Sequence, residues 1–272
     1  MTDIKVQDAM DQFLDSLCKH EHEAFQQQDV EACFEMLAEF LVYYSNLFPD
    51  QEEPEDISLD DWEEALEGYV EKLFEGDMER TPDLGGLSLM TLDAEYFRDF
   101  LGWYVLREPS ASSVMVKTFS KVLQAWALFM RQHNFLNDVQ KTELCAVLDE
   151  VAISAGDAAT AAHLLLYYVR LGAGVAPRLR GKRFDAFVEG HARIERLDMN
   201  QNTVFLGFDN QDAPVVPIVL PLEIMNYLHP GDVLDVEMGQ RGGQWIMVDI
   251  GPVYPSCIYM EADELKVPDK LT

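Results

Sequence analysis

Apolar residues between positions 6 and 171 recur with the period of an α-helix. Near the start of the chain their spacing of three and four residues marks one helix face, formed by Val6, Met10, Phe13, Leu14 and Leu17. A second stripe runs from Cys33 to Phe48, and we expect Asp29 to be the N-cap of that helix. Later stripes predict helices that begin after Ser58, after Thr91 and after Ser112 or Ser113, because hydroxyl side chains cap helix starts well.

Two further helices are predicted at the end of this region. The first covers positions 137–155 and the second covers 157–171, and we expect Gly156 to separate them because glycine disfavours a helix interior. Gly172 and Gly174 then stop the second helix. About seven helices and no strand pattern predict an all-α domain over residues 1–176.

After Arg183 the apolar pattern changes to the alternation of β-strands. One face of a first strand carries Phe184, Ala186, Val188, Ala192 and Ile194, and one face of a second carries Val204, Leu206 and Phe208. Strands are also predicted at 215–220, 233–238 and 245–250. A short helix that begins at Pro221 lies between the third and fourth strands, and glycines 239, 242 and 243 form the turn before the fifth.

This order predicts an α + β chain with two domains, the second being a small five-stranded β-barrel. Five short strands with one helix between the third and fourth resemble the OB-type barrel; the alternative is an SH3-like barrel, whose short helical turn usually comes later. We expect the acidic helical domain at 1–176, a basic boundary at 177–183, the barrel at 184–256 and a C-terminal tail at 257–272. Element order supports a fold, and a fold alone does not define a function.

Charge is distributed unevenly along the chain. The formal net charge is -29, of which residues 1–90 carry -21, residues 91–176 carry -2 and residues 177–272 carry -6. Such acidity repels phosphate backbones and anionic lipid surfaces and favours cationic partners or plain solubility. Four dispersed cysteines without a C-x-x-C pair, and no apolar segment near the ~20 residues that span a bilayer, predict a cytoplasmic protein that does not bind membranes.

Catalytic signatures are absent from the sequence. It contains no phosphate-binding loop, no dinucleotide-binding glycine pattern and no nucleophile elbow, so we predict neither catalytic residues nor a cofactor, and a non-enzymatic role is favoured. One weak metal candidate combines Cys18 and His22, four apart on the first helix, with Cys33 on the second. A closed zinc site needs four ligands, so buried thiols are the favoured interpretation and no metal is predicted.

The outward positions of the predicted strands give a mixed picture for nucleic-acid binding. They carry ring or soft side chains (Phe187, Phe205, Trp245, Met247) and the bases Arg183, His191 and Arg193, which suit base stacking. The same positions carry seven acids: Asp185, Glu189, Glu195, Asp209, Asp235, Glu237 and Asp249. A possible basic patch at one end of the barrel consists of Arg178, Arg180, Lys182, Arg183 and Arg241. Affinity for nucleic acid comes largely from cations that displace counterions, so a face with net negative charge binds it poorly.

Three functional hypotheses follow. The first is a binding protein whose acidic helical domain and barrel present a surface to a protein partner. The second is a single-strand nucleic-acid binder that uses the OB-like barrel and the basic boundary, and the third is an enzyme with a site between the domains. With acids on the neighbouring strands, we expect the basic run at 177–183 to hold the barrel against the helical domain.

Overall fold

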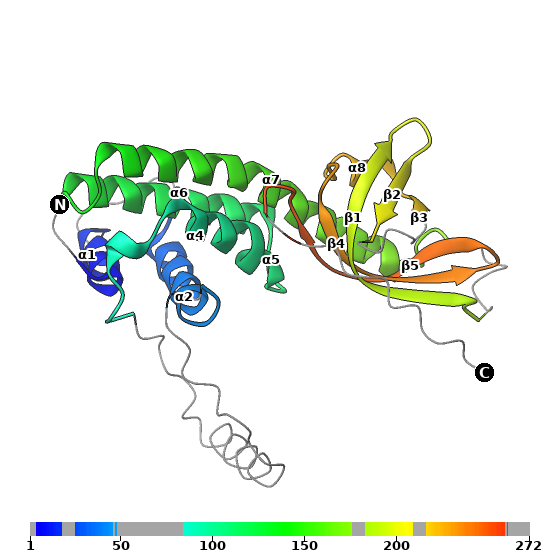
Figure 1. Ribbon diagram of the computed structural model, residues 1–272, viewed down its shortest axis with the longest axis horizontal. Coiled ribbons are helices and arrows are strands. Elements are labelled where there is room, and N and C mark those ends of the chain that lie inside the picture. The colour runs from blue at the N-terminus through cyan, green and yellow to red at the C-terminus, as the bar shows by residue number, and fades with distance from the viewer. Residues whose placement is uncertain are drawn as a thin grey trace, which may run out of the picture.

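The computed structural model describes residues 4–17, 25–45, 47, 84–175, 183–208, 216–258 and 260 of the chain. Helices come first and a five-stranded antiparallel sheet follows, which confirms the α + β class and the predicted order. Figure 1 shows the long helices at one end of the molecule and the curled sheet at the other. Within these ranges, no helix has both the length and the apolar character that crossing a bilayer requires.

The helical part of the chain is built around α6 and α7, which lie side by side (Figure 1). Its elements are α1 (Val6–Leu17), α2 (Gln27–Tyr43), the short 3-10 helix η1 (Leu89–Thr91), α4 (Ala94–Asp99), the π-helix η2 (Phe100–Tyr104), α5 (Val105–Arg107), α6 (Ser113–Gln132) and α7 (Asp138–Arg170). The predicted apolar face of α1 is confirmed at Val6, Met10 and Phe13, which are buried. The predicted helix after Ser58 lies outside the described residues.

Trp126 of α6 is the centre of the helical core. It is fully buried, its ring meets Phe34 of α2 and Phe97 of α4 edge to face, and its Nε1 donates to the backbone oxygen of Ala9 at 3.3 Å. A buried indole N–H needs such an acceptor, because an unsatisfied donor costs free energy. One side chain therefore fixes four helices relative to one another.

Of the N-caps predicted for α2, α4 and α6, one is confirmed and two are wrong. Ser112 caps α6, its hydroxyl accepting from the backbone N–H of Met115, as predicted. Asp29 is not the cap of α2 but its third residue, where its carboxylate accepts from the backbone N–H of Gln26. Asp93 rather than Thr91 caps α4, because the chain first makes the 3-10 turn of η1.

The prediction of two helices at 137–171 is wrong, since α7 runs unbroken for 33 residues. Gly156 lies buried in its middle, with Lys117 and Ser113 of α6 nearby and its carbonyl accepting from the Thr160 hydroxyl. A glycine in a helix interior costs about 1 kcal/mol, which packing on both sides offsets. The first half of α7 packs on α4 and α6, and its second half continues under the sheet.

The sheet contains β1 (Ala186–Asp198), β2 (Thr203–Gly207), β3 (Val216–Val219), β4 (Val233–Arg241) and β5 (Gln244–Tyr254), in the order β3-β2-β1-β4-β5. The long strand β1 pairs with β4 along its first half and with β2 along its second, so the sheet curls around it. The short helix α8 (Leu222–Met225) links β3 to β4. Gly242 and Gly243 adopt positive φ in the two-residue turn between β4 and β5, as this hairpin type requires.

Bulges change the predicted faces of two strands. In β5 the pairing shifts between Glu237 and Met238 of its partner, which turns Met247 inward, where it is 2% exposed; its predicted outward position is wrong. In β1 the pairing shifts between Ile194 and Arg196. A single extra residue reverses the face of every residue beyond it, which strict alternation cannot anticipate.

Helices and sheet share one continuous apolar core that reaches from Val6 to Ile258. The contact is made mainly by β5, whose second half lies on α7 (Figure 1). Just after β5, the side chain of Ile258 lies against Gly102 of the π-helix so closely that a Cβ at that position would overlap it. Ile258, which belongs to the predicted C-terminal tail at 257–272, is therefore packed at this junction. The division of the chain into two domains remains a prediction.

Asp232 fixes the path of the chain into that junction. It is 2% exposed, and its two carboxylate oxygens accept from the backbone N–H groups of His229 at 2.7 Å and Ser256 at 3.0 Å. One side chain thus joins the turn before β4 to the residue that precedes Cys257 and Ile258. The basic run expected to hold the barrel in place is described only at Arg183, so that hypothesis is not tested.

The contact between Gly102 and Ile258 predicts an interdependent pair of substitutions. Gly102→Ala should lower the free energy of unfolding by about 1–3 kcal/mol, because its methyl group displaces Ile258. In an Ile258→Ala background the same change should cost much less, since only the Val151 side chain, at 3.1 Å from the added Cβ, remains close. Urea unfolding of the four proteins measures this coupling.

Gly156→Ala is the matched control, because its nearest neighbour would stand at 3.7 Å, an ordinary contact distance. It should stabilise the protein by about 0.5–1 kcal/mol through helix propensity. Equal effects of Gly102→Ala with and without Ile258 would contradict the proposed contact.

Candidate functional site

Three carboxylates form a row across the outer face of the sheet. The pairing places Glu189 of β1 opposite Glu237 of β4, and Glu237 opposite Asp249 of β5. Directly opposed residues of adjacent strands have Cβ atoms about 4.5–5.5 Å apart, so these side chains are neighbours. Glu189 and Asp249 are exposed and Glu237 is half-buried. We call these three residues the carboxylate row.

The carboxylate row is electrostatically unfavourable. Partial burial, followed by the charges of Asp249, Glu189 and Asp235, raises the pKa of Glu237 above its ordinary value of 4.5. No ion pair joins any member of the row to a cation in the described part of the chain. Like charges directly opposite one another destabilise a sheet, so the fold maintains this face at a cost in stability.

Asp235 extends the negative face toward the helices. It pairs with His191 across β1 and β4, and its side chain covers Gly251 of β5, where any Cβ would collide with it. The ring of His191 lies 5.9 Å from that of Tyr254, whose pKa is raised to about 12, chiefly by burial. Tyr254 is therefore a neutral phenol at physiological pH.

The residues predicted for nucleic-acid binding do not gather in one place. Arg178, Arg180 and Lys182 lie outside the described residues, and Arg183 is exposed. The side chains of Phe187, Trp245 and Arg241 belong to the end of the sheet formed by the β4–β5 turn, and the Arg241 guanidinium lies 3.9 Å from the centre of the Phe184 ring.

The other two predicted residues lie on β1 and β2, further from this end of the sheet. Arg193 donates to the backbone oxygen of Met260 at 2.9 Å. It is six residues from Phe187, which is about 20 Å along a strand. Phe205 belongs to β2, where it pairs with Arg196 of β1. The predicted set therefore forms at least two separate groups, and its role in binding remains untested.

Sequence reasoning missed Arg196. Strict alternation places it in the core, but the bulge after Ile194 turns it outward, where its guanidinium lies 3.8 Å from the centre of the Phe205 ring. Pro217 of β3 is the next residue across from Phe205. The same guanidinium lies 3.9 Å from the carboxylate of Asp198, also on β1.

The predicted metal candidate is described only in part. Cys33 is fully buried in the helical core, and this burial raises the pKa of its thiol well above the usual range. Cys18 and His22 lie outside the described residues, so their arrangement stays a prediction. Within the ranges that the structure describes, no three His, Cys, Asp or Glu side chains are arranged so that they could hold a metal ion.

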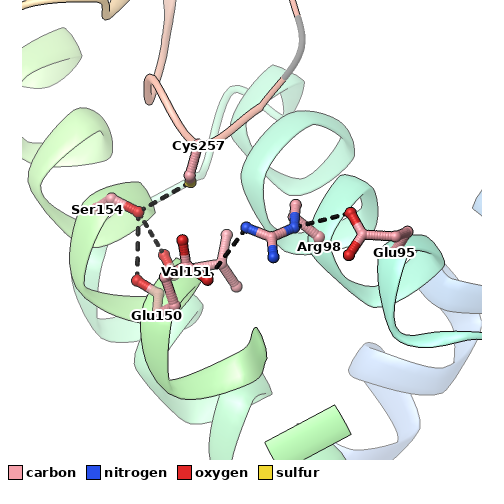
Figure 2. Close-up of polar contacts among 6 residues, drawn as sticks. All are labelled: Glu95, Arg98, Glu150, Val151, Ser154 and Cys257. Carbon is pink, nitrogen blue, oxygen red and sulfur yellow. Dashed lines mark hydrogen bonds and ion pairs between the residues drawn. The ribbon is translucent and has the colours of Figure 1, made fainter. Parts of the chain in front are cut away.

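Figure 2 shows the polar contacts at the junction of helices and sheet. The Cys257 sulfur lies 3.2 Å from the Ser154 hydroxyl of α7. Nearby, Arg98 of α4 pairs with Glu95 at 2.9 Å and reaches Glu150 of α7 at 3.3 Å. Burial raises the pKa of the Cys257 thiol, which favours its neutral form.

A hollow of about 250 Å³ also lies between the helices and the sheet. Its walls come from the end of α5, the middle of α7 and the second half of β5. Most lining side chains are apolar or small, and the titratable ones are Arg107, Glu108 and His163. An interdomain site of this kind was the third hypothesis from the sequence, and catalysis there remains untested.

Comparison with models of known protein families, with curated proteins and with solved structures gives no match to this chain.

The carboxylate row predicts a pH-dependent stability. Because the pKa of Glu237 is higher in the folded than in the unfolded chain, its contribution to stability is complete below about pH 4.5 and is lost as pH rises through the raised value. Glu237→Gln should remove this loss, so the variant's melting temperature should exceed that of the wild type increasingly above pH 4.5. The gain should shrink in high salt, which screens the repulsion.

Glu35→Gln is the matched control, because Glu35 is an exposed residue in the middle of α2 and far from the row in sequence. It makes the same change in net charge. An equal gain in both variants would mean that the effect comes from the overall charge of the protein and not from the row.

Proposed function

We propose that this protein is a non-enzymatic binding protein whose carboxylate row receives a cationic segment of a protein partner. The observation that carries the proposal is the direct opposition of Glu189, Glu237 and Asp249 on three adjacent strands. A Lys- or Arg-rich segment laid across the strands supplies the positive charge that the sheet lacks.

The cost of the row supports a role in binding. Local rules of stability are broken mostly at functional sites, and here three like charges stand where a single lysine would stabilise the sheet. A cationic partner relieves this repulsion. Binding therefore offsets part of the free-energy cost of holding the three carboxylates together in the folded state. The acidity of the whole chain adds long-range attraction for the same partner.

The test uses a fluorescently labelled octa-arginine peptide as the cationic probe. The double variant Glu237→Gln with Asp249→Asn should bind it about twofold to thirtyfold more weakly at low salt, since two charge contacts at the protein surface contribute about 0.4–2 kcal/mol. Fluorescence anisotropy measures the affinity at two salt concentrations.

The control is Glu35→Gln with Glu143→Gln, which has the same net charge but leaves the row intact. Both glutamates are exposed on the helical part of the chain. If the two double variants bind the peptide equally, attraction by the overall charge explains the binding, and the proposed site is wrong.

Single-strand nucleic-acid binding is the second candidate, and we infer an OB-like fold for the sheet as its basis. The strand order, with α8 between β3 and β4, supports that fold. The two-residue turn between β4 and β5 leaves no room for the helical turn of the SH3-like alternative. OB barrels bind oligonucleotides on the face of strands two and three, where aromatic side chains stack on bases.

The specific observation in favour of this function is the pair of Arg196 and Phe205. The Arg196 guanidinium lies over the half-buried Phe205 ring, so a cation and an aromatic side chain adjoin on this face. The carboxylates on the other part of the sheet oppose a long phosphate backbone, so this candidate ranks second.

This function predicts that Phe205→Ala weakens the binding of a labelled thymidine oligonucleotide at low salt by about 1–3 kcal/mol, the usual contribution of one stacked base. Tyr167→Ala is the control, because Tyr167 is an aromatic residue of α7 that is 62% exposed. Anisotropy that shows no salt-sensitive oligonucleotide binding by the wild type would exclude this candidate.

A further inference from the structure

The structure assigns a second binding site, separate from the carboxylate row, to the hollow between α5, α7 and β5. We propose that it takes a small organic monocarboxylate with an apolar body. The hollow encloses about 250 Å³ and is bounded by both the helices and the sheet. Ligand sites favour such junctions and combine an apolar lining with few polar groups.

Arg107 supplies the anion-binding group. Its guanidinium lies 4.6 Å from the centre of the Trp103 ring and 5.4 Å from that of Tyr44, and these two contacts hold the cation in place. Within the described residues, no hydrogen bond or ion pair uses its N–H donors. The chain has 49 acidic residues, which could pair with an arginine. An arginine at the edge of the hollow whose donors are unused is therefore a candidate anion-binding group.

The remaining lining defines the rest of the ligand. Ala162, Leu166 and Pro252 are among the side chains that give the hollow an apolar wall suited to a short hydrocarbon or a single ring. His163 of α7 adds one more polar group to the lining.

Glu108 limits the charge of the ligand. It lines the same hollow, so a dianionic phosphate meets a repulsive neighbour, whereas a carboxylate carries one negative charge and matches the fork of one guanidinium. The volume is also small for a nucleotide, since pockets for drug-sized ligands start near ~300 Å³. Both arguments favour a small monocarboxylate.

Titration calorimetry with benzoate and hexanoate tests the site, with hexan-1-ol and phenyl phosphate as comparison probes. Wild-type protein should bind the carboxylates more tightly than the alcohol or the phosphate. Arg107→Gln should weaken carboxylate binding at least about tenfold and leave the alcohol unchanged, because a hydrogen-bonded charge is lost. Ala162→Met should abolish binding of all probes by filling the hollow.

The Arg107 side chain is exposed, so its replacement leaves the core intact, and melting temperatures of both variants check folding. The row variant Glu237→Gln with Asp249→Asn should bind benzoate like the wild type, which separates this site from the proposed partner surface. The assignment is overturned if the wild type binds no carboxylate, if Arg107→Gln makes no difference, or if phenyl phosphate binds more tightly than benzoate.

Discussion

The packing of β5 and the segment after it against the helices is the constraint on which the rest of the structure depends. Ile258 fills the space that Gly102 leaves open on the π-helix, and Asp232 holds the backbone of Ser256, two residues earlier. A π-helix adds a residue to a turn, a feature that recurs at functional positions in helices. Because β5 pairs with β4 and also packs on α7, this packing positions the sheet relative to α7.

The same strand explains why the two proposed sites remain separate. Asp249 points to solvent in the carboxylate row, whereas the next residues, from Ile250 to Val253, face the core or line the hollow. The bulge in β5 makes this division possible, because it lets Met247 and Ile250 both turn inward across an exposed residue. A regular strand would alternate strictly and place the two on opposite faces.

Much of the fold follows from the sequence, because it depends on local rules. The apolar face of α1, the cap at Ser112 and the five strands with their intervening helix were all predicted from spacing and capping chemistry. The failures have a common physical cause, which is that tertiary packing overrides a local signal. Gly156 does not break α7, since neighbouring elements support both halves, and Met247 faces inward because of a bulge.

The candidate sites, too, could be predicted from the sequence only in part. Alternation predicted that Glu189, Glu237 and Asp249 face outward, but only the pairing register places them directly opposite one another. Arg196 could not be predicted, since its face depends on a bulge. The contacts of Arg107 of α5 reach Trp103 of η2 and Tyr44, the C-cap of α2, which only the fold brings together. The total charge of the chain favoured a cationic partner, whereas the position of the proposed site could be found only from the pairing register of the strands. A charge distribution therefore becomes a functional hypothesis only once the fold shows which repulsions the protein retains at a cost in stability.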